Sequence, residues 1–189
     1  KLKAQELGEV RMAEQLLVGD FENAISDLRL LAQTPSLKRY LNDGTPSEKQ
    51  RVTDQFLNMV QTRQRYDQIR YLDHSGMEKI RVNLTNNHAV ATPERELQNK
   101  SERYFFRDTL ALGATEIYVS ALDLNIEQGK IELPYKPTVR FGTPLLNRAG
   151  KKRGVLLLNY YGQELLDDFR HVMGEQRHVM LLNQNGYWL

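Results

Sequence analysis

The sequence contains no cysteine among its 189 residues. Disulfide bonds, thiolate metal sites and cysteine nucleophiles are therefore excluded. A chain without free thiols suits an oxidising compartment, where a stray thiol is a hazard, but cytoplasmic proteins can lack cysteine too. The absence of cysteine thus excludes disulfide and thiol chemistry but does not decide in which cellular compartment the protein works.

Recognisable catalytic and metal-binding patterns are also missing. The sequence has no G-x-S-x-G elbow and no glycine-rich nucleotide loop. The neighbouring carboxylates Asp167 and Asp168 would point about 100° apart on a helix, so they cannot flank one bond. No two histidines lie at the i, i+4 spacing of a helical metal site. The histidines are His74, His88, His171 and His178. We therefore expect no catalytic residues, no metal, no cofactor and no enzymatic activity in this chain.

The chain has little net charge and no long apolar run. Its formal net charge is +2, with basic residues scattered along the sequence, whereas nucleic-acid-binding domains usually concentrate them in one patch. We expect no nucleic-acid partner. No apolar run reaches the ~18 residues of a membrane span, and no signal peptide is visible. Because Lys1 is not a start methionine, we expect the parent protein to continue upstream, with any membrane helices outside these residues.

Residues 1–33 have a helical pattern with an apolar stripe. The stripe repeats at spacings of four and three residues, as in a heptad seam. Its members are Leu17, Phe21, Ala24, Leu28 and Leu31. Two interpretations stay open: the stripe packs only on the core of its own domain, or it also forms the seam of a homodimer. We expect a homodimer through this N-terminal helix.

The rest of the chain predicts an α+β fold with a mostly antiparallel sheet, because short hairpin links join most of the expected strands. Expected helices cover 35–44, 46–62, 101–112 and 163–171. Expected strands cover 66–73, 78–85, 116–124, 137–146, 153–161 and 177–183. Residues 86–95 are expected to form a polar loop.

Arginines inside strand-like runs are the best candidates for binding. Strand alternation places Tyr66, Gln68 and Arg70 on one face. Such a face is a poor core and a good ligand surface, since arginine presents a planar fork of donors to a carboxylate. The alternative is an internal ion pair of Arg70 with Glu78 or Asp123.

Other candidates lie on neighbouring segments of the chain. Arg81 and Arg140 also lie within strand-like runs, and Tyr118 lies on a later strand. Gly142, close to Arg140, allows a ligand or a backbone to approach closely. We expect a pocket over the sheet formed by Tyr66, Arg70 and Tyr118, with Arg140 and Arg81 as weaker candidates.

Three segments in this order resemble the double Cache (PDC-type, PAS-like) sensor domains of bacterial histidine kinases, diguanylate cyclases and chemoreceptors. They are YDQIRYLDHSGMEKIRVN, SALDLNIEQGKIELPYKPTVRFGTPLL and GVLLLNYYGQELL. The resemblance covers nearly all of residues 1–172. It implies a long N-terminal helix (within 1–65) packed on a PAS-like sheet, a membrane-distal module at 66–174, and the start of a truncated membrane-proximal module at 175–189.

The resemblance implies a periplasmic or extracellular sensing domain of an inner-membrane receptor, whose output domain can be a kinase or a diguanylate cyclase. Amino-acid-binding members of the family use a tyrosine, an arginine, paired aromatics and a late aspartate. Tyr66 and Arg70 hold a comparable place here, and Tyr118 lies on a later strand. Only Tyr71 follows Arg70, however, and residues 153–161 contain no aspartate. The expected ligand is therefore a small polar metabolite such as a carboxylate. The alternative function is a ligand-free PAS-like domain for interaction or dimerisation.

Overall fold

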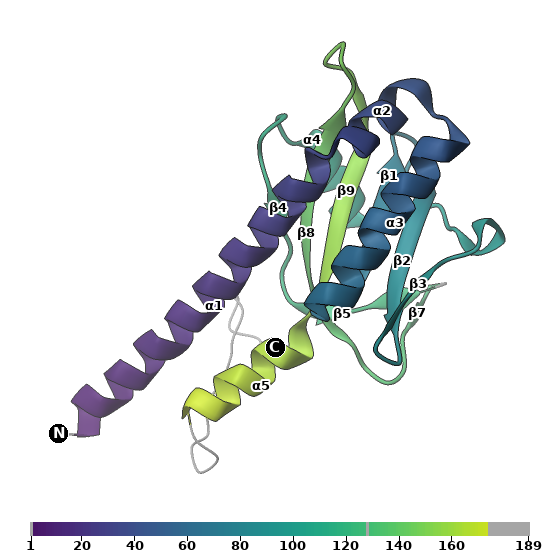
Figure 1. Cartoon of the computed structure of the whole chain (residues 1–189). Coiled ribbons are helices and arrows are strands. Elements are labelled where there is room, and N and C mark those ends of the chain that lie inside the picture. The colour runs from purple at the N-terminus through teal and green to yellow at the C-terminus, as the bar shows by residue number, and fades with distance from the viewer. Residues whose placement is uncertain (1, 128, 174–189) are drawn as a thin grey trace. The chain divides into compact units, whose positions relative to one another are not determined.

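The computed structural model describes residues 2–127 and 129–173 of the chain (Figure 1). The helices are α1 (Leu2–Ala32), α2 (Pro35–Asp43), α3 (Pro46–Arg63), the 3-10 helix η1 (Glu94–Glu96), α4 (Tyr104–Ala111) and α5 (Gly162–Met173). The strands are β1 (Tyr66–Asp73), β2 (Glu78–Thr85), β3 (His88–Ala91), β4 (Tyr118–Val119), β5 (Asp123–Leu124), β6 (Ile126–Glu127), β7 (Lys130–Ile131), β8 (Pro137–Leu146) and β9 (Lys152–Tyr161). The strand expected at residues 177–183 lies outside the described residues.

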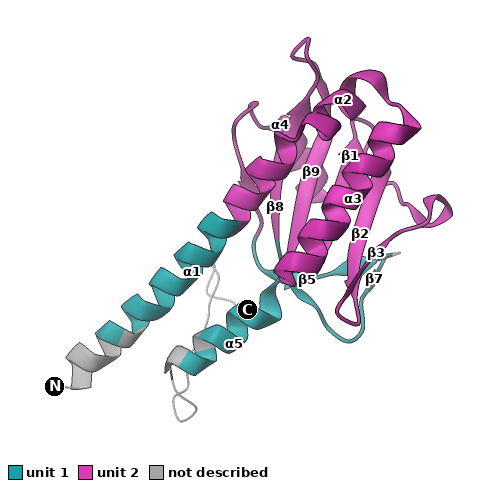
Figure 2. Cartoon of the chain, viewed as in Figure 1, with its two compact units in different colours: residues 1–23, 121–139, 161–189 teal, residues 24–120, 140–160 magenta. Residues whose placement is uncertain are grey.

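Two compact units divide the chain, as Figure 2 shows. One comprises residues 1–23, 121–139 and 161–189, and the other comprises residues 24–120 and 140–160. In the first unit, β5 pairs with the start of β8, β6 pairs with β7, and Glu132 accepts a hydrogen bond from Asn125 at 2.9 Å. The second unit contains most of the sheet. The three-part division expected from the sequence stays a prediction.

The main sheet has the strand order β3-β2-β1-β9-β8-β4, and β5 also pairs with β8. All pairings between the described strands are antiparallel. The predicted α+β class, a long N-terminal helix with a mostly antiparallel sheet, is confirmed. No helix within residues 2–127 and 129–173 has the length and apolar character needed to cross a membrane.

Two expected segments differ from the structure. The expected polar loop at 86–95 contains β3, because Asn86 and Asn87 adopt positive φ angles of 50° and 63° and turn the chain straight back onto β2. The expected strand at 116–124 is instead two short strands, β4 and β5, which pair with different parts of β8.

Helices cover both faces of the sheet in the second unit. Helix α3 and the last turns of α1 cover one face, where the rings of Tyr71 in β1 and Tyr40 in α2 meet edge to face at 5.9 Å. Helix α4 covers the other face, where Phe105 and Phe106 pack with Leu72 of β1 and with β9. Alternate residues of β1 thus face different helices.

The apolar stripe of α1 belongs largely to the core. Ala24, Leu28 and Leu31 are 1%, 0% and 3% exposed, so these three residues are not available to a second copy of the chain. The prediction that they form a dimer seam is wrong, because one helix face cannot be buried twice. Larger exposed apolar side chains occur elsewhere on α1, including Met12 and Leu16.

Candidate functional site

A bulge in β1 separates Tyr66 from Arg70. Tyr66 pairs with Tyr160 and Gln68 pairs with Asn159, so β1 takes two residue steps where β9 takes one. Tyr66 therefore faces α1 and α3, and its hydroxyl donates a hydrogen bond to Asp27 at 2.7 Å. The prediction that Tyr66 and Arg70 share a face is wrong, because simple alternation assumed an unbulged strand.

Tyr66 takes part in buried polar contacts on the face of the sheet that α1 and α3 cover. Asp27 is 4% exposed and also accepts a hydrogen bond from Arg63 at 2.8 Å. Burial raises the pKa of the Tyr66 phenol above its usual value, and the hydrogen bond to Asp27 raises it further. The hydroxyl thus stays protonated and donates. In this structure Tyr66 connects β1 to α1.

Arg70 and Arg81 are direct partners across β1 and β2. Two like charges in that position repel each other, and Glu78 lies within reach of both. One carboxylate oxygen of Glu78 is 3.5 Å from Arg70 Nη1, and the other is 3.1 Å from Arg81 Nη1. Glu78 is 0% exposed and also accepts the backbone N–H of Gln98 at 3.0 Å. Of the two partners considered for an internal pair, the structure shows Glu78.

Arg70 also takes part in an amide network. Its Nη2 donates to Asn159 Oδ1 at 2.9 Å, and Asn159 Nδ2 donates to Gln68 Oε1 at 3.2 Å. Gln68 and Arg70 therefore share a face, as predicted. The network orients the guanidinium toward α4.

Three guanidinium groups surround the ring of Phe105. The Cζ atoms of Arg70, Arg103 and Arg140 lie 5.2, 5.3 and 5.0 Å from the ring centroid. Each contact is within cation–π range. Positive charge thus accumulates at the start of α4 and the strands beneath it.

Two tyrosines border this cluster. Tyr104 Oη lies 3.3 Å from Arg140 Nη1, and Tyr118 packs against the apolar cluster around Phe105. Both tyrosines and Arg103 are half-buried, whereas Arg70 and Arg140 are 1% and 0% exposed. A solute would therefore meet Arg103 and the tyrosines first.

Helix α4 can approach the sheet because of Gly142. A Cβ built there would lie 2.6 Å from Thr109 Oγ1 of α4. The close approach expected at this glycine is therefore made by a helix, and it holds Phe105 over Arg140.

The structure brings together Arg70, Arg140 and Tyr118 around Phe105, connects Arg81 to them through Glu78, and leaves Tyr66 on the opposite face. Their role in binding stays a prediction. Sequence reasoning missed Arg103, Tyr104 and Phe105. The run Arg103-Tyr104-Phe105-Phe106 at the start of an expected helix was the available signal.

The side chains of this cluster are chemically suited to bind an anion. Guanidinium and phenol groups donate hydrogen bonds and stack, and they suit a carboxylate. Within the described residues, no group of three or more histidine, aspartate or glutamate side chains is placed to hold a metal ion.

Comparison with solved structures shows the same fold in sensory proteins. A domain of a putative sensory box/GGDEF family protein from Vibrio parahaemolyticus matches with a TM-score of 0.77 and 24% identity, over 88% of this chain and 63% of that one. The extracellular domain of the putative histidine kinase vpHK1S-Z8 gives 0.77 and 24%, over 88% and 60%. The sensory domain of the Campylobacter jejuni chemoreceptor Tlp3 (CcmL) gives 0.70 and 12%, over 100% and 70%. The chain thus spans about three fifths of the first two structures.

Comparison with curated protein sequences gives no match. A family model described as the sensor domain of bacterial histidine kinases matches residues 20–189. The structural neighbours confirm the resemblance to sensory domains of the Cache type. Because the model covers most of the sequence, the chain belongs to the family of bacterial histidine kinase sensor domains.

Proposed function

We propose that the chain senses a small anionic metabolite, with a carboxylate as the recognised group, as the extracytoplasmic part of a transmembrane receptor. The observation that carries the proposal is the gathering of three guanidinium groups around the Phe105 ring. A carboxylate that enters beside this group meets several charge-assisted hydrogen-bond donors, in addition to the Glu78 carboxylate that already pairs with Arg70. Arg103, Tyr104 and Tyr118 are half-buried and can be reached from solvent, whereas the guanidinium groups of Arg70 and Arg140 are buried.

Solved structures with the same fold support the proposal of a small-molecule ligand and of an extracytoplasmic location. The Tlp3 sensory domain has been solved with isoleucine bound, and it matches this chain with a TM-score of 0.64 and 13% identity. The vpHK1S-Z8 structure is of an extracellular domain. The proposed site uses a different set of residues from the one expected, with Arg103 and Tyr104 in place of Tyr66.

A second candidate is a ligand-free interaction domain. The near-complete burial of Arg70 and Arg140, and the internal pairing of Arg70 with Glu78, favour it. A ligand screen separates the two candidates, because a ligand-free domain responds to no small solute.

The first prediction is the outcome of that screen. Thermal unfolding of the chain should be measured with amino acids, organic acids, amines and nucleobases. At least one compound that carries a carboxylate should raise the midpoint, since a ligand at 100 times its Kd adds ~2.7 kcal/mol of apparent stability. Amines of matching shape should have no effect, because the cluster is cationic. A screen in which only amines stabilise, or in which nothing does, would contradict the proposal.

We further propose a parallel homodimer through the exposed side of α1. Met12 and Leu16 are 57% and 47% exposed, and Gly19 and Asn23 continue their row at spacings of three and four residues. A glycine allows two helices to approach closely, and an asparagine at a core position favours a two-stranded seam. The seam is expected to be weak in the isolated chain, since it is short.

The second prediction tests this seam by sedimentation at high protein concentration. The chain should associate weakly, and Leu16→Lys should abolish association by placing like charges in the seam. Val18→Lys is the matched control, because Val18 is 50% exposed and lies about 200° around the helix from Leu16. Equal loss in both variants, or a strictly monomeric chain, would remove the proposed seam.

A further inference from the structure

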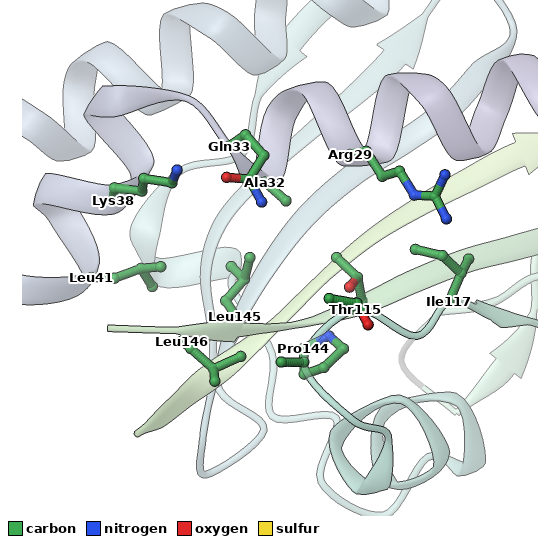
Figure 3. A pocket seen from close by; sticks show the side chains of 12 residues that line it. Arg29, Ala32, Gln33, Lys38, Leu41, Thr115, Ile117, Pro144, Leu145 and Leu146 are labelled. Atoms are coloured by element: carbon green, nitrogen blue, oxygen red, sulfur yellow. The ribbon is translucent and has the colours of Figure 1, made fainter. Parts of the chain in front are cut away.

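A separate cavity lies on the sheet face opposite α4. Its volume is about 460 Å³, and four segments line it: the last turn of α1, helix α2, the residues before β4, and the end of β8. Figure 3 shows Arg29 on α1 at one side of the cavity, near Ile117, and Lys38 on α2 at the other side, near Leu41. Leu145 and Leu146 on β8 form the floor between them. The Phe105 cluster lies under α4 on one face of the sheet, whereas α1 and α2, which line this cavity, lie on the other face, where Tyr40 of α2 contacts Tyr71 of β1.

The walls of the cavity combine apolar surface with positive charge. Aliphatic groups come from Ala32, Leu41, Pro144, Leu145 and Leu146. The ionisable residues of the lining are Arg29 and Lys38, and no aspartate or glutamate of the described chain lines it. Both cations are exposed at the rim, where a ligand can reach them.

The volume suits a small molecule. Ligand pockets commonly measure ~300–1,000 Å³, with mostly apolar walls and a few polar groups that fix orientation. An apolar floor with two cations at the rim selects a molecule that has an aliphatic body and one anionic end. A purely polar anion would leave the apolar floor in contact with water. An aliphatic amine would be repelled by the two positive charges.

We propose that this cavity is a second binding site, for a free aliphatic carboxylate whose chain lies on Leu145 and Leu146 and whose carboxylate is held at the rim, where Arg29 and Lys38 lie on opposite sides of the cavity. The occupant would contact α1, α2 and β8 at once. The site does not depend on the Phe105 cluster, and it holds even if that cluster binds nothing.

The test uses octanoate as the ligand and isothermal titration as the measurement. Octanoate should bind the chain, whereas octanamide, which keeps the body and loses the charge, should bind at least about tenfold more weakly. The double variant Arg29→Glu/Lys38→Glu should lose binding by at least the same factor. Lys151→Glu is the matched control, since Lys151 is exposed in the turn between β8 and β9 and outside the lining.

Two further variants make the outcome specific. Ala32→Phe should fill the cavity and abolish octanoate binding while the charges stay. Arg103→Ala, which alters only the Phe105 cluster, should leave octanoate binding unchanged. Equal affinity for octanamide and octanoate would overturn the proposal, as would binding that survives Ala32→Phe, binding lost in Arg103→Ala, or no binding of octanoate at millimolar concentration.

Discussion

The Glu78→Ala variant is expected to lose about 3–5 kcal/mol of unfolding free energy. Glu78 is fully buried and lies between the guanidinium groups of Arg70 and Arg81, which are direct partners across two strands. Removing the carboxylate leaves two like charges facing each other in the sheet and removes its hydrogen bond with the Gln98 N–H. Urea unfolding followed by circular dichroism measures the loss.

Glu96→Ala is the matched control for this prediction. The Glu96 side chain is 54% exposed and its ion pair with Arg95 is at the surface, where such pairs contribute about 0–1 kcal/mol. A Glu78→Ala variant no less stable than Glu96→Ala would show that Glu78 does not compensate the two arginines.

The Gly154→Ala variant is expected to lose about 3 kcal/mol or more. Gly154 in β9 has a φ of 146°, and a Cβ there would lie 1.9 Å from the carbonyl oxygen of Leu72. That oxygen belongs to the backbone of β1, which pairs with β9 at this point, so neither strand can move without breaking the ladder. The same urea experiment measures the effect.

Gly8→Ala serves as the comparison. A Cβ on Gly8 meets nothing within 4 Å, and alanine is favoured over glycine in a helix by roughly 0.5–1 kcal/mol. This variant should therefore show no loss. If Gly154→Ala unfolds at the same urea concentration as Gly8→Ala, the close approach of β1 and β9 described above is incorrect.

The elements that the sequence predicted best have strong local signals. Thr34-Pro35 and Thr45-Pro46 mark where α2 and α3 begin, and the long β8 and β9 hairpin follows from its apolar strands and its Asn147-to-Gly150 turn. Such signals depend on neighbouring residues alone. The face of the sheet that a residue occupies depends on strand partners far along the chain, and the sequence predicted these faces less well.

Tyr66 shows how one extra residue in a strand places a predicted site residue on the wrong face of the sheet. Alternation requires an unbroken ladder, and a bulge near the start of β1 moved Tyr66 to the opposite face. The bulge arises from pairing with β9, about 90 residues later, so the sequence of β1 alone could not reveal it. Arg103 was missed for a similar reason, since its position over Phe105 depends on how α4 packs on the sheet.

The stripe on α1 was ambiguous for a different reason. A row of apolar residues fits a core and a dimer seam equally well, because both bury the same side chains. The structure assigns Leu28 and Leu31 to the core. Only the packing of α1 on its own sheet could make that choice.

The most direct test of the proposed sensor is the affinity of the carboxylate found in the thermal screen for two single variants, measured by isothermal titration. Arg103 directly precedes α4 and is half-buried over the Phe105 ring, whereas Arg107 lies within α4 and is exposed. We expect Arg103→Ala to weaken binding at least about tenfold, since a hydrogen bond to a charged group contributes roughly 1.5–3 kcal/mol. Arg107→Ala should bind as the unaltered chain does. Unchanged affinity in Arg103→Ala, or an equal loss in both variants, would contradict ligand recognition at the Phe105 cluster.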